Sequence, residues 1–223
     1  MFDVVIYVED KNDVSFLRDF IVLNYCSRDI SKAIYITEKE YKINIENKNV
    51  LISDTNKTVS NEETAGWGKI KGQINSGSFE RKLQENENTK FLIIFDADED
   101  KNENIKHKND NIDNWLKEKN FLIERFYLPF NNTESHNLEQ LLELSFNESI
   151  TDCWESFINC IVNKDNKNAI EPTSKKGKII IYKDIYSSLK NNKNEYLSKM
   201  WNLDASTNEH LKPLKEFLDK HLK

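Results

Sequence analysis

Two short runs of consecutive apolar residues mark the chain, at positions 4–8 and 91–95. Neither run alternates with polar residues, which is the pattern of a strand buried on both faces of a parallel sheet. Each run stops at acidic residues. A segment with helical spacing of apolar positions follows the first run, from Val14 to Leu23, and Asp13 is its expected N-cap.

The rest of the pattern predicts strands and helices in alternation, which favours a parallel sheet with helices on both faces. Further strands are expected at 33–37, 41–45, 50–53 and 121–128, and further helices at 79–84, around 112–116, and at 137–144, 150–161, 177–189 and 210–222. The strands at 33–53 are expected to form a small meander beside the main sheet. The run at 154–158 is expected to lie in the core.

These elements predict an α/β fold with a mostly parallel central sheet, a strand-rich insert at about 33–65 and a helical C-terminal third. We expect a core at 1–145 and a helical extension at 146–223 packed on it. A length of 223 residues suits one large domain or a domain with an appended subdomain.

Composition narrows the function classes. The formal net charge of −6 is not the signature of a general nucleic-acid binder, although it allows acids that hold a metal beside a local basic patch. The cysteines, Cys26, Cys153 and Cys160, lack metal-ligand spacing and indicate a reducing compartment. No apolar run approaches the roughly 20 residues that span a bilayer. We therefore expect a cytoplasmic protein without a membrane anchor.

Acidic residues cluster where the two apolar runs end. Glu9 follows the first, and Asp96, Asp98 and Asp100 alternate after the second. Parallel strands bring their carboxyl ends to one edge, where open α/β sheets bind ligands. Neighbouring carboxylates repel one another unless a cation lies among them. The pattern predicts that Glu9, Asp96 and Asp98 bind Mg²⁺, or Mn²⁺ in its place. The alternative is that these acids only cap the helices that follow.

The arrangement resembles the toprim family, in which E-x-x-x-D follows one strand and D-x-D a later one. Here these are Glu9 to Asp13 and Asp96 to Asp98, and Asp100 extends the second motif. The family includes topoisomerases, bacterial primases, ribosomal-RNA maturases and overcoming-lysogenization-defect nucleases. The L-E-Q-L-L segment at 138–142 and the lysine-rich segment at 176–182 are similar to small stand-alone bacterial toprim proteins related to those nucleases. The resemblance covers about residues 1–190. Toprim chains usually carry glycine where this chain has Asp10.

The resemblance implies a Rossmann-like toprim fold and Mg²⁺-dependent phosphoryl transfer on nucleic acid. Glu9, Asp96 and Asp98 would be catalytic acids, and Lys178, with Lys176 nearby, would neutralise charge on the phosphate. A second metal would use Asp13, Asp100 or Glu139. Each of these residues also has a plain alternative role. Asp13 and Glu139 could simply favour the first turns of their helices, and lysines are common throughout the chain.

A glycine-rich segment at 66–72 is a candidate phosphate contact. Gly66 and Gly68 could let backbone amides approach a phosphate, while Lys69 and Lys71 could contact the backbone of nucleic acid and Trp67 could stack on a base. The segment matches no P-loop or dinucleotide fingerprint, so a plain turn is the alternative.

The sequence therefore predicts a toprim nuclease acting on nucleic acid, with DNA favoured and RNA still open, and anti-phage defence is suggested by family analogy alone. The alternative is a non-catalytic toprim module that binds nucleic acid, a nucleotide or a protein partner. The net charge of −6 favours it, because a nuclease must overcome repulsion from its substrate. A homodimer and a separate partner subunit both stay open. A response-regulator receiver fits less well, because it would be about half this length.

Overall fold

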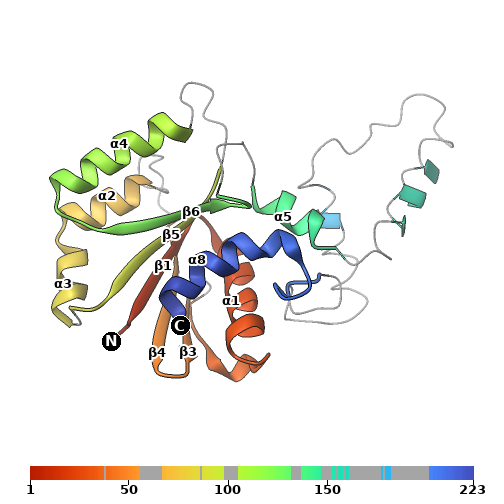
Figure 1. Ribbon diagram of the computed structural model, residues 1–223, viewed down its shortest axis with the longest axis horizontal. Helices are drawn as coiled ribbons and strands as arrows, with labels where there is room; N and C mark the ends of the chain where they lie inside the picture. The colour runs from red at the N-terminus through yellow and green to blue at the C-terminus, as the bar shows by residue number, and fades with distance from the viewer. Residues whose placement is uncertain are drawn as a thin grey trace.

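The fold is built around one mixed sheet (Figure 1). The computed structural model describes residues 1–37, 39–55, 67–85, 87–97, 105–131, 137–146, 152–153, 155–157, 159–160, 177, 179–181 and 201–223. Six strands follow the order β2-β3-β4-β1-β5-β6. They are β1 (Val4–Val8), β2 (Ala33–Thr37), β3 (Glu40–Ile45), β4 (Lys48–Asp54), β5 (Lys90–Asp96) and β6 (Ile123–Leu128). The parallel ladders are β4–β1, β1–β5 and β5–β6, whereas β2, β3 and β4 are antiparallel. The expected α/β fold is confirmed.

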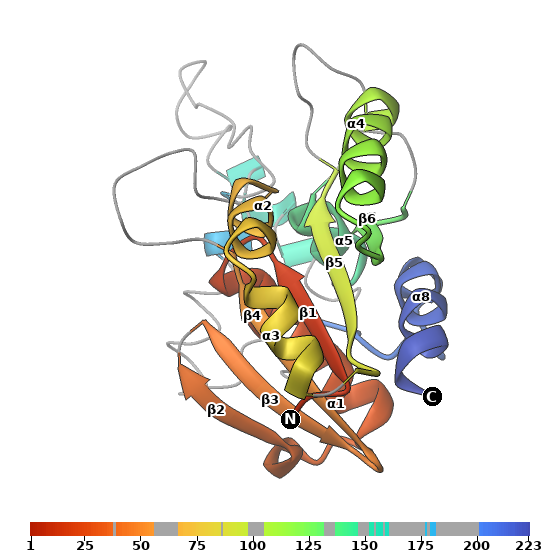
Figure 2. The ribbon, with the colours of Figure 1, turned by 90° about the vertical axis from the view of Figure 1, so that its left-hand side faces the viewer.

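Helices lie on both faces of the sheet (Figures 1 and 2). One face carries α1 (Lys11–Tyr25), α5 (Leu138–Leu144) and α8 (Lys212–Leu222), and the other carries α2 (Trp67–Asn75), α3 (Ser78–Glu85) and α4 (Ile105–Glu118). Successive residues of β1 enter different cores because strand side chains alternate. Ile6 packs on the α1 face and Tyr7 on the α2 face.

The strand-rich segment differs from the expected meander beside the sheet. Its last strand, β4, pairs with β1 in register, so that Val4 lies opposite Val50 and Val8 opposite Asp54. The segment thus forms half of the main sheet. The physical reason is the continuous apolar run at 50–52, which is typical of an interior strand rather than an edge strand. A β-bulge at Ile36 interrupts the register between β2 and β3.

Three helix starts also differ from expectation. The N-cap of α1 is Asp10 and not Asp13. Residues 67–72 belong to α2 rather than to a turn, since glycine weakens a helix by only about 1 kcal/mol and Ile70 and Ile74 are buried one helical turn apart. The helix α4 begins at Ile105, several residues before the helix expected around 112–116. Helices expected at 79–84 and 137–144 are confirmed as α3 and α5.

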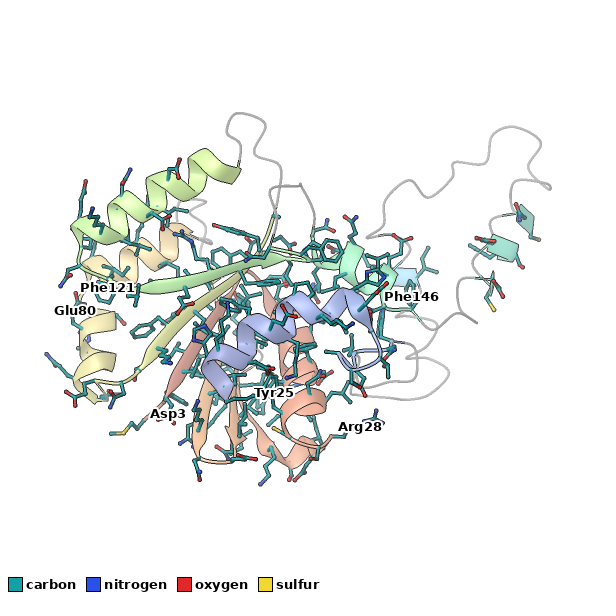
Figure 3. The ribbon with its side chains drawn as sticks, in the orientation of Figure 1. Asp3, Tyr25, Arg28, Glu80, Phe121 and Phe146 are labelled. Carbon is teal, nitrogen blue, oxygen red and sulfur yellow. The ribbon has the colours of Figure 1, made fainter. Side chains whose placement is uncertain are left out.

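The chain returns to the sheet through its last helix. A 3-10 turn, η3 (Glu209–Leu211), leads into α8 as expected. The Tyr25 hydroxyl, at the end of α1, donates to Asp219 Oδ1 at 2.7 Å, and Figure 3 shows Tyr25 beside α8. The Phe217 ring lies 5.4 Å from that of Phe126 on β6. The helix α8 therefore joins α1 to the sheet.

Two expectations about the remainder of the chain can be checked. Residues 155–157 are exposed, with Phe157 at 47%, so the prediction that the run at 154–158 is core is wrong at its described positions. In the parts of the chain that the structure describes, no helix has the length and apolar character needed to span a bilayer.

Candidate functional site

The carboxyl edge of the parallel strands brings the first two acids together. In the β1–β5 ladder, Val8 lies opposite Ile94, so Glu9 and Asp96 follow closely on adjacent strands. Thr55, just after β4, fixes the end of β1. Its Oγ1 donates to the carbonyl oxygens of Val8 at 2.9 Å and Glu9 at 3.4 Å. Its backbone N–H also donates to the carbonyl oxygen of Val8, at 2.8 Å. The Glu9 backbone is therefore held in place from a third strand.

Asp96 connects this edge to the start of α5. Its Oδ1 accepts a hydrogen bond from the backbone N–H of Leu138 at 2.9 Å. Asn137 is the N-cap of α5 and accepts from the N–H of Gln140 at 3.2 Å. The next residue after Leu138 is Glu139, in the first turn of the helix. Asp96 thus brings Glu139 to the edge of the sheet where Glu9 lies.

The start of α1 adds two more carboxyl groups. Asp10 and Asp13 form a capping box, in which Asp10 Oδ1 accepts from the N–H of Asp13 at 3.2 Å and Asp13 Oδ2 accepts from the N–H of Asp10 at 3.0 Å. The N–H of Asn12 also donates to Asp10 Oδ1, at 2.6 Å. Where toprim chains usually place glycine, this chain therefore has a helix cap. The reciprocal bonds satisfy orphan N–H groups of the first turn.

Asp13 shows that these acids share one electrostatic environment. Its side chain is only 6% exposed. Burial is the main reason that the pKa of Asp13 lies well above its usual value, and the nearby charges of Asp10, Glu9 and Glu139 raise it further, whereas the bond from the Asp10 N–H lowers it. We call Glu9, Asp13, Asp96 and Glu139 the edge carboxylates. They come from four different elements or element ends, and the charges of Glu9 and Glu139 act on Asp13.

The donor set suits a hard divalent cation. Carboxylate oxygens are the ligands that Mg²⁺ prefers, and Mg²⁺ keeps several waters, so one or two carboxylates suffice. The raised pKa of Asp13, caused first by burial and then by neighbouring carboxylates, shows that several acids lie close together at this edge. Among the described residues, however, no three Asp, Glu, His or Cys side chains are arranged to hold one ion together. Asp98 and Asp100 lie outside the described residues.

The predicted phosphate contacts are only partly described. Lys176, Lys178 and Gly66 lie outside the described residues. Gly68 and Lys69 belong to the first turn of α2, so they lie in a helix and not in a loop. Lys71 is exposed, and its Nζ lies 5.6 Å from the centre of the Trp115 ring on α4. The structure therefore places Lys71 between two helices of the α2 face.

One residue at this edge was missed by the sequence analysis. Asp54 ends β4, lies opposite Val8 and is 3% exposed. Its position nearly repeats the pattern of an acid after an apolar run, because only Ser53 separates Asp54 from Val50-Leu51-Ile52. The same rule that identified Glu9 and Asp96 would have found it. Three adjacent parallel strands thus end in acids.

Two cavities lined by described residues lie elsewhere. One, of about 530 Å³, is at the opposite edge of the sheet, between the start of β5 and the loop before β6, and includes Lys90, Phe121 and Leu122. The other, of about 670 Å³, lies past the end of α5 and includes Phe146, Asn202 and His210. Neither is lined by an edge carboxylate. Comparisons of the chain with family models, with curated proteins and with solved structures found no match.

Proposed function

We propose that the protein is a metal-dependent phosphodiesterase acting on nucleic acid, with DNA as the preferred substrate. The observation that carries the proposal is the convergence of the edge carboxylates at the carboxyl ends of β1 and β5. This is the edge at which open α/β sheets bind ligands. The resemblance of Glu9, Asp13, Asp96 and Asp98 to the toprim motifs supports the same reaction, and a role in anti-phage defence rests on that resemblance alone.

Each described acid has a role in this proposal. Glu9 and Asp96 would hold Mg²⁺ or Mn²⁺, and Asp13 and Glu139 would bind its waters or a second ion. A bound ion would polarise a phosphodiester and supply an activated water. The chain's own contribution is orientation: Thr55 fixes the Glu9 backbone, and the Leu138 N–H fixes Asp96 Oδ1. Preorganised ligands spare the cost of ordering them during the reaction.

The second candidate is a non-catalytic module that binds a nucleic acid, a nucleotide or a protein through the same edge. The net charge of −6 favours it, because phosphate contacts normally require lysine and arginine. The two candidates differ in one observable. A nuclease cuts, whereas a module binds metal or partner without turnover.

A cleavage assay separates them. Supercoiled plasmid, single-stranded DNA and RNA would be incubated with Mg²⁺ or Mn²⁺ and the wild-type protein, Glu9→Ala or Asp96→Ala. The matched control is Glu118→Ala, an exposed acid at the far end of α4. Cutting that needs metal, survives in the control and is lost in both site variants supports the nuclease. Cutting that persists in both site variants overturns it.

A thermal melt addresses the metal itself. An ion that binds only the native state must raise the melting temperature. We expect a rise with millimolar Mg²⁺ in the wild type and in Glu118→Ala, and a smaller rise in Glu9→Ala. A rise without cutting would favour the module, and no rise in the wild type would count against the metal-dependent nuclease and favour a module that binds its partner without metal.

A further inference from the structure

The polar cavity of about 670 Å³ lies where α5 ends and the approach to α8 begins. The turn η3, which leads into α8, lies against α5, and Figure 3 shows Phe146 just past the end of α5. The helix α5 starts at Leu138, whose N–H binds Asp96. Its seven residues, at about 1.5 Å each, make it about 10 Å long. One short helix therefore separates the cavity from the edge carboxylates.

A second connection links the cavity to the same edge of the sheet. The ring of His210, in η3, lies 6.3 Å from the ring of Phe130. Phe130 follows the end of β6, where Leu128 lies opposite Asp96 in the β5–β6 ladder. Figure 1 shows α5 between the end of β6 and the start of α8. The wall that carries His210 thus lies beside the strand next to Asp96.

A buried hydrogen-bond network holds the walls of the cavity. Asn208 is 7% exposed, and its Nδ2 donates to Ser145 Oγ at 3.0 Å and to the carbonyl oxygen of Asn202 at 2.8 Å. Its Oδ1 accepts from the backbone N–H of His210 at 3.1 Å. The carbonyl oxygen of Ser145 in turn accepts from the N–H of Asn202 at 2.8 Å. The loop before α8 is therefore fastened to the end of α5, and the cavity is preorganised.

The side chains that line the cavity are of the kinds that bind a nucleotide. The exposed Lys212 ammonium and a ring N–H of His210 can donate to phosphate oxygens. The ring of Phe146, which stacks on Trp201 at 5.8 Å and 16°, offers a surface for a base. Glu209 is the only acid among the described residues that line the cavity. The cavity therefore lacks the acidic excess of a chain whose net charge is −6.

We propose that this cavity binds one unpaired nucleotide, through its phosphate and its base, of the strand that lies at the edge carboxylates. The inference rests on the proposed function for the identity of the strand. The volume lies in the range of roughly 300–1,000 Å³ that is usual for ligand pockets. The length of α5 equals about three nucleotide steps, because one strand of B-DNA rises about 3.4 Å per nucleotide. The substrate is therefore single-stranded a few nucleotides from the bond that is cut.

Fluorescence anisotropy of a short labelled oligothymidine strand tests the phosphate contact. The assay uses the full chain in EDTA, so that no cutting occurs. Lys212→Ala is expected to weaken binding about five- to tenfold. It should also reduce the slope of log affinity against log salt by about 0.7, the contribution of one phosphate contact on a single strand. Lys220→Ala, at an exposed lysine further along α8, is the matched control and should bind like the wild type. Thermal melts check that both variants are folded.

A second variant tests the base contact. Phe146→Leu is expected to weaken binding of oligothymidine at least about fivefold, the smaller end of what one stacked base contributes. Binding of an abasic strand of the same length should not change, because such a strand has no base to stack. A general loss of structure would weaken binding of both strands alike. The double-stranded form of the same sequence should compete less well than the single strand, since its bases are paired.

Three results would overturn the proposal: a wild type that does not bind the single strand, a Lys212→Ala variant with the affinity and salt dependence of the wild type, or a Phe146→Leu variant that loses affinity for both strands equally. The cleavage assay with Glu9→Ala tests the reaction separately. Binding as expected without any cutting would support this site in the non-catalytic module. Metal-dependent cutting together with unchanged binding by Lys212→Ala would leave the nuclease standing and remove this site.

Discussion

Asp96 Oδ1 accepts a hydrogen bond from the backbone N–H of Leu138, 42 residues later in the chain, at 2.9 Å. The same carboxylate therefore ends β5, holds the start of α5 and is the leading candidate for metal binding. Two substitutions separate the structural role from the functional one. Asp96→Ala removes both the acceptor oxygen and the charge, whereas Asp96→Asn removes only the charge.

Asp96→Ala removes the acceptor and should lower the free energy of unfolding by about 1 kcal/mol, the usual cost of losing a helix-start acceptor. Asp96→Asn keeps an oxygen for the Leu138 N–H and should cost only a few tenths of that value. Both should lose the Mg²⁺-induced rise in melting temperature. Urea unfolding with and without Mg²⁺ measures all of this, and equal destabilisation by the two variants would contradict the structural role.

Asp13→Asn is expected to stabilise the metal-free protein near neutral pH by about 1 kcal/mol, because it removes a charge that is buried among other acids. The amide oxygen can still accept from the N–H of Asp10. The folded-state pKa of Asp13 is raised, so its contribution to stability is present at acidic pH and is lost as pH rises through that pKa. The advantage of the variant should therefore shrink at low pH, and also when Mg²⁺ is added. A destabilised variant in EDTA at neutral pH would contradict this account.

His221 should make the stability of the protein depend on pH in the direction opposite to that of Asp13. Its side chain is 3% exposed on α8. Burial lowers its pKa, the Lys90 and Lys220 charges lower it further, and the Glu124 carboxylate opposes them. Nε2 lies 3.3 Å from Glu124 Oε2, without a hydrogen bond of good geometry to any described residue. The net direction is downward, so burial outweighs the single half-exposed carboxylate.

A lowered folded-state pKa means that the stability contribution is present above the unfolded value of about 6.5 and is lost as pH falls through the folded one. We expect His221→Gln to flatten the loss of stability as pH falls below about 6.5, by at most about 1.4 kcal/mol per pH unit. Denaturant unfolding across that range is the measurement. Parallel pH curves for the variant and the wild type would show that another group is responsible.

The elements that the sequence predicted best are those whose signal is local. The apolar runs of β1 and β5 and the acids after them needed no knowledge of distant residues. The bond from Leu138 to Asp96 and the placement of β4 beside β1 are tertiary contacts, and no local pattern encodes them. Asp54 is an intermediate case. The sequence shows an acid close after an apolar run, but the pairing of β4 with β1 could not be predicted from it. The glycines at 68 and 72 favoured a loop or turn, yet they lie in α2. A helix tolerates such weak helix formers where Ile70 and Ile74 are buried.

Tyr25 gives a test of how α8 is held. Its hydroxyl donates to Asp219 Oδ1 at 2.7 Å, and Lys215 and Lys223 also bind that carboxylate. Although burial opposes it, these bonds lower the pKa of Asp219 to about 2. Tyr25→Phe should cost about 1 kcal/mol and speed amide exchange in α8 more than in α4. Tyr35→Phe, at a mostly exposed tyrosine, is the control, and an equal effect of both would argue against a specific tie.

The largest loss of stability is expected at Arg18. Its Nε donates to Asp19 Oδ1 at 2.6 Å, and its guanidinium binds and covers Tyr41 of β3. Asp19 is fully buried, so Arg18→Ala removes a positive charge from beside a carboxylate in the core. Breaking such a pair usually costs about 3–5 kcal/mol. Arg28→Ala is the matched control, because Arg28 lies 3.8 Å from Asp204 with 70% of its side chain exposed and should cost less than about 1 kcal/mol. Chemical unfolding distinguishes the two, and similar losses would mean that the Arg18–Asp19 pair contributes no more than a surface contact.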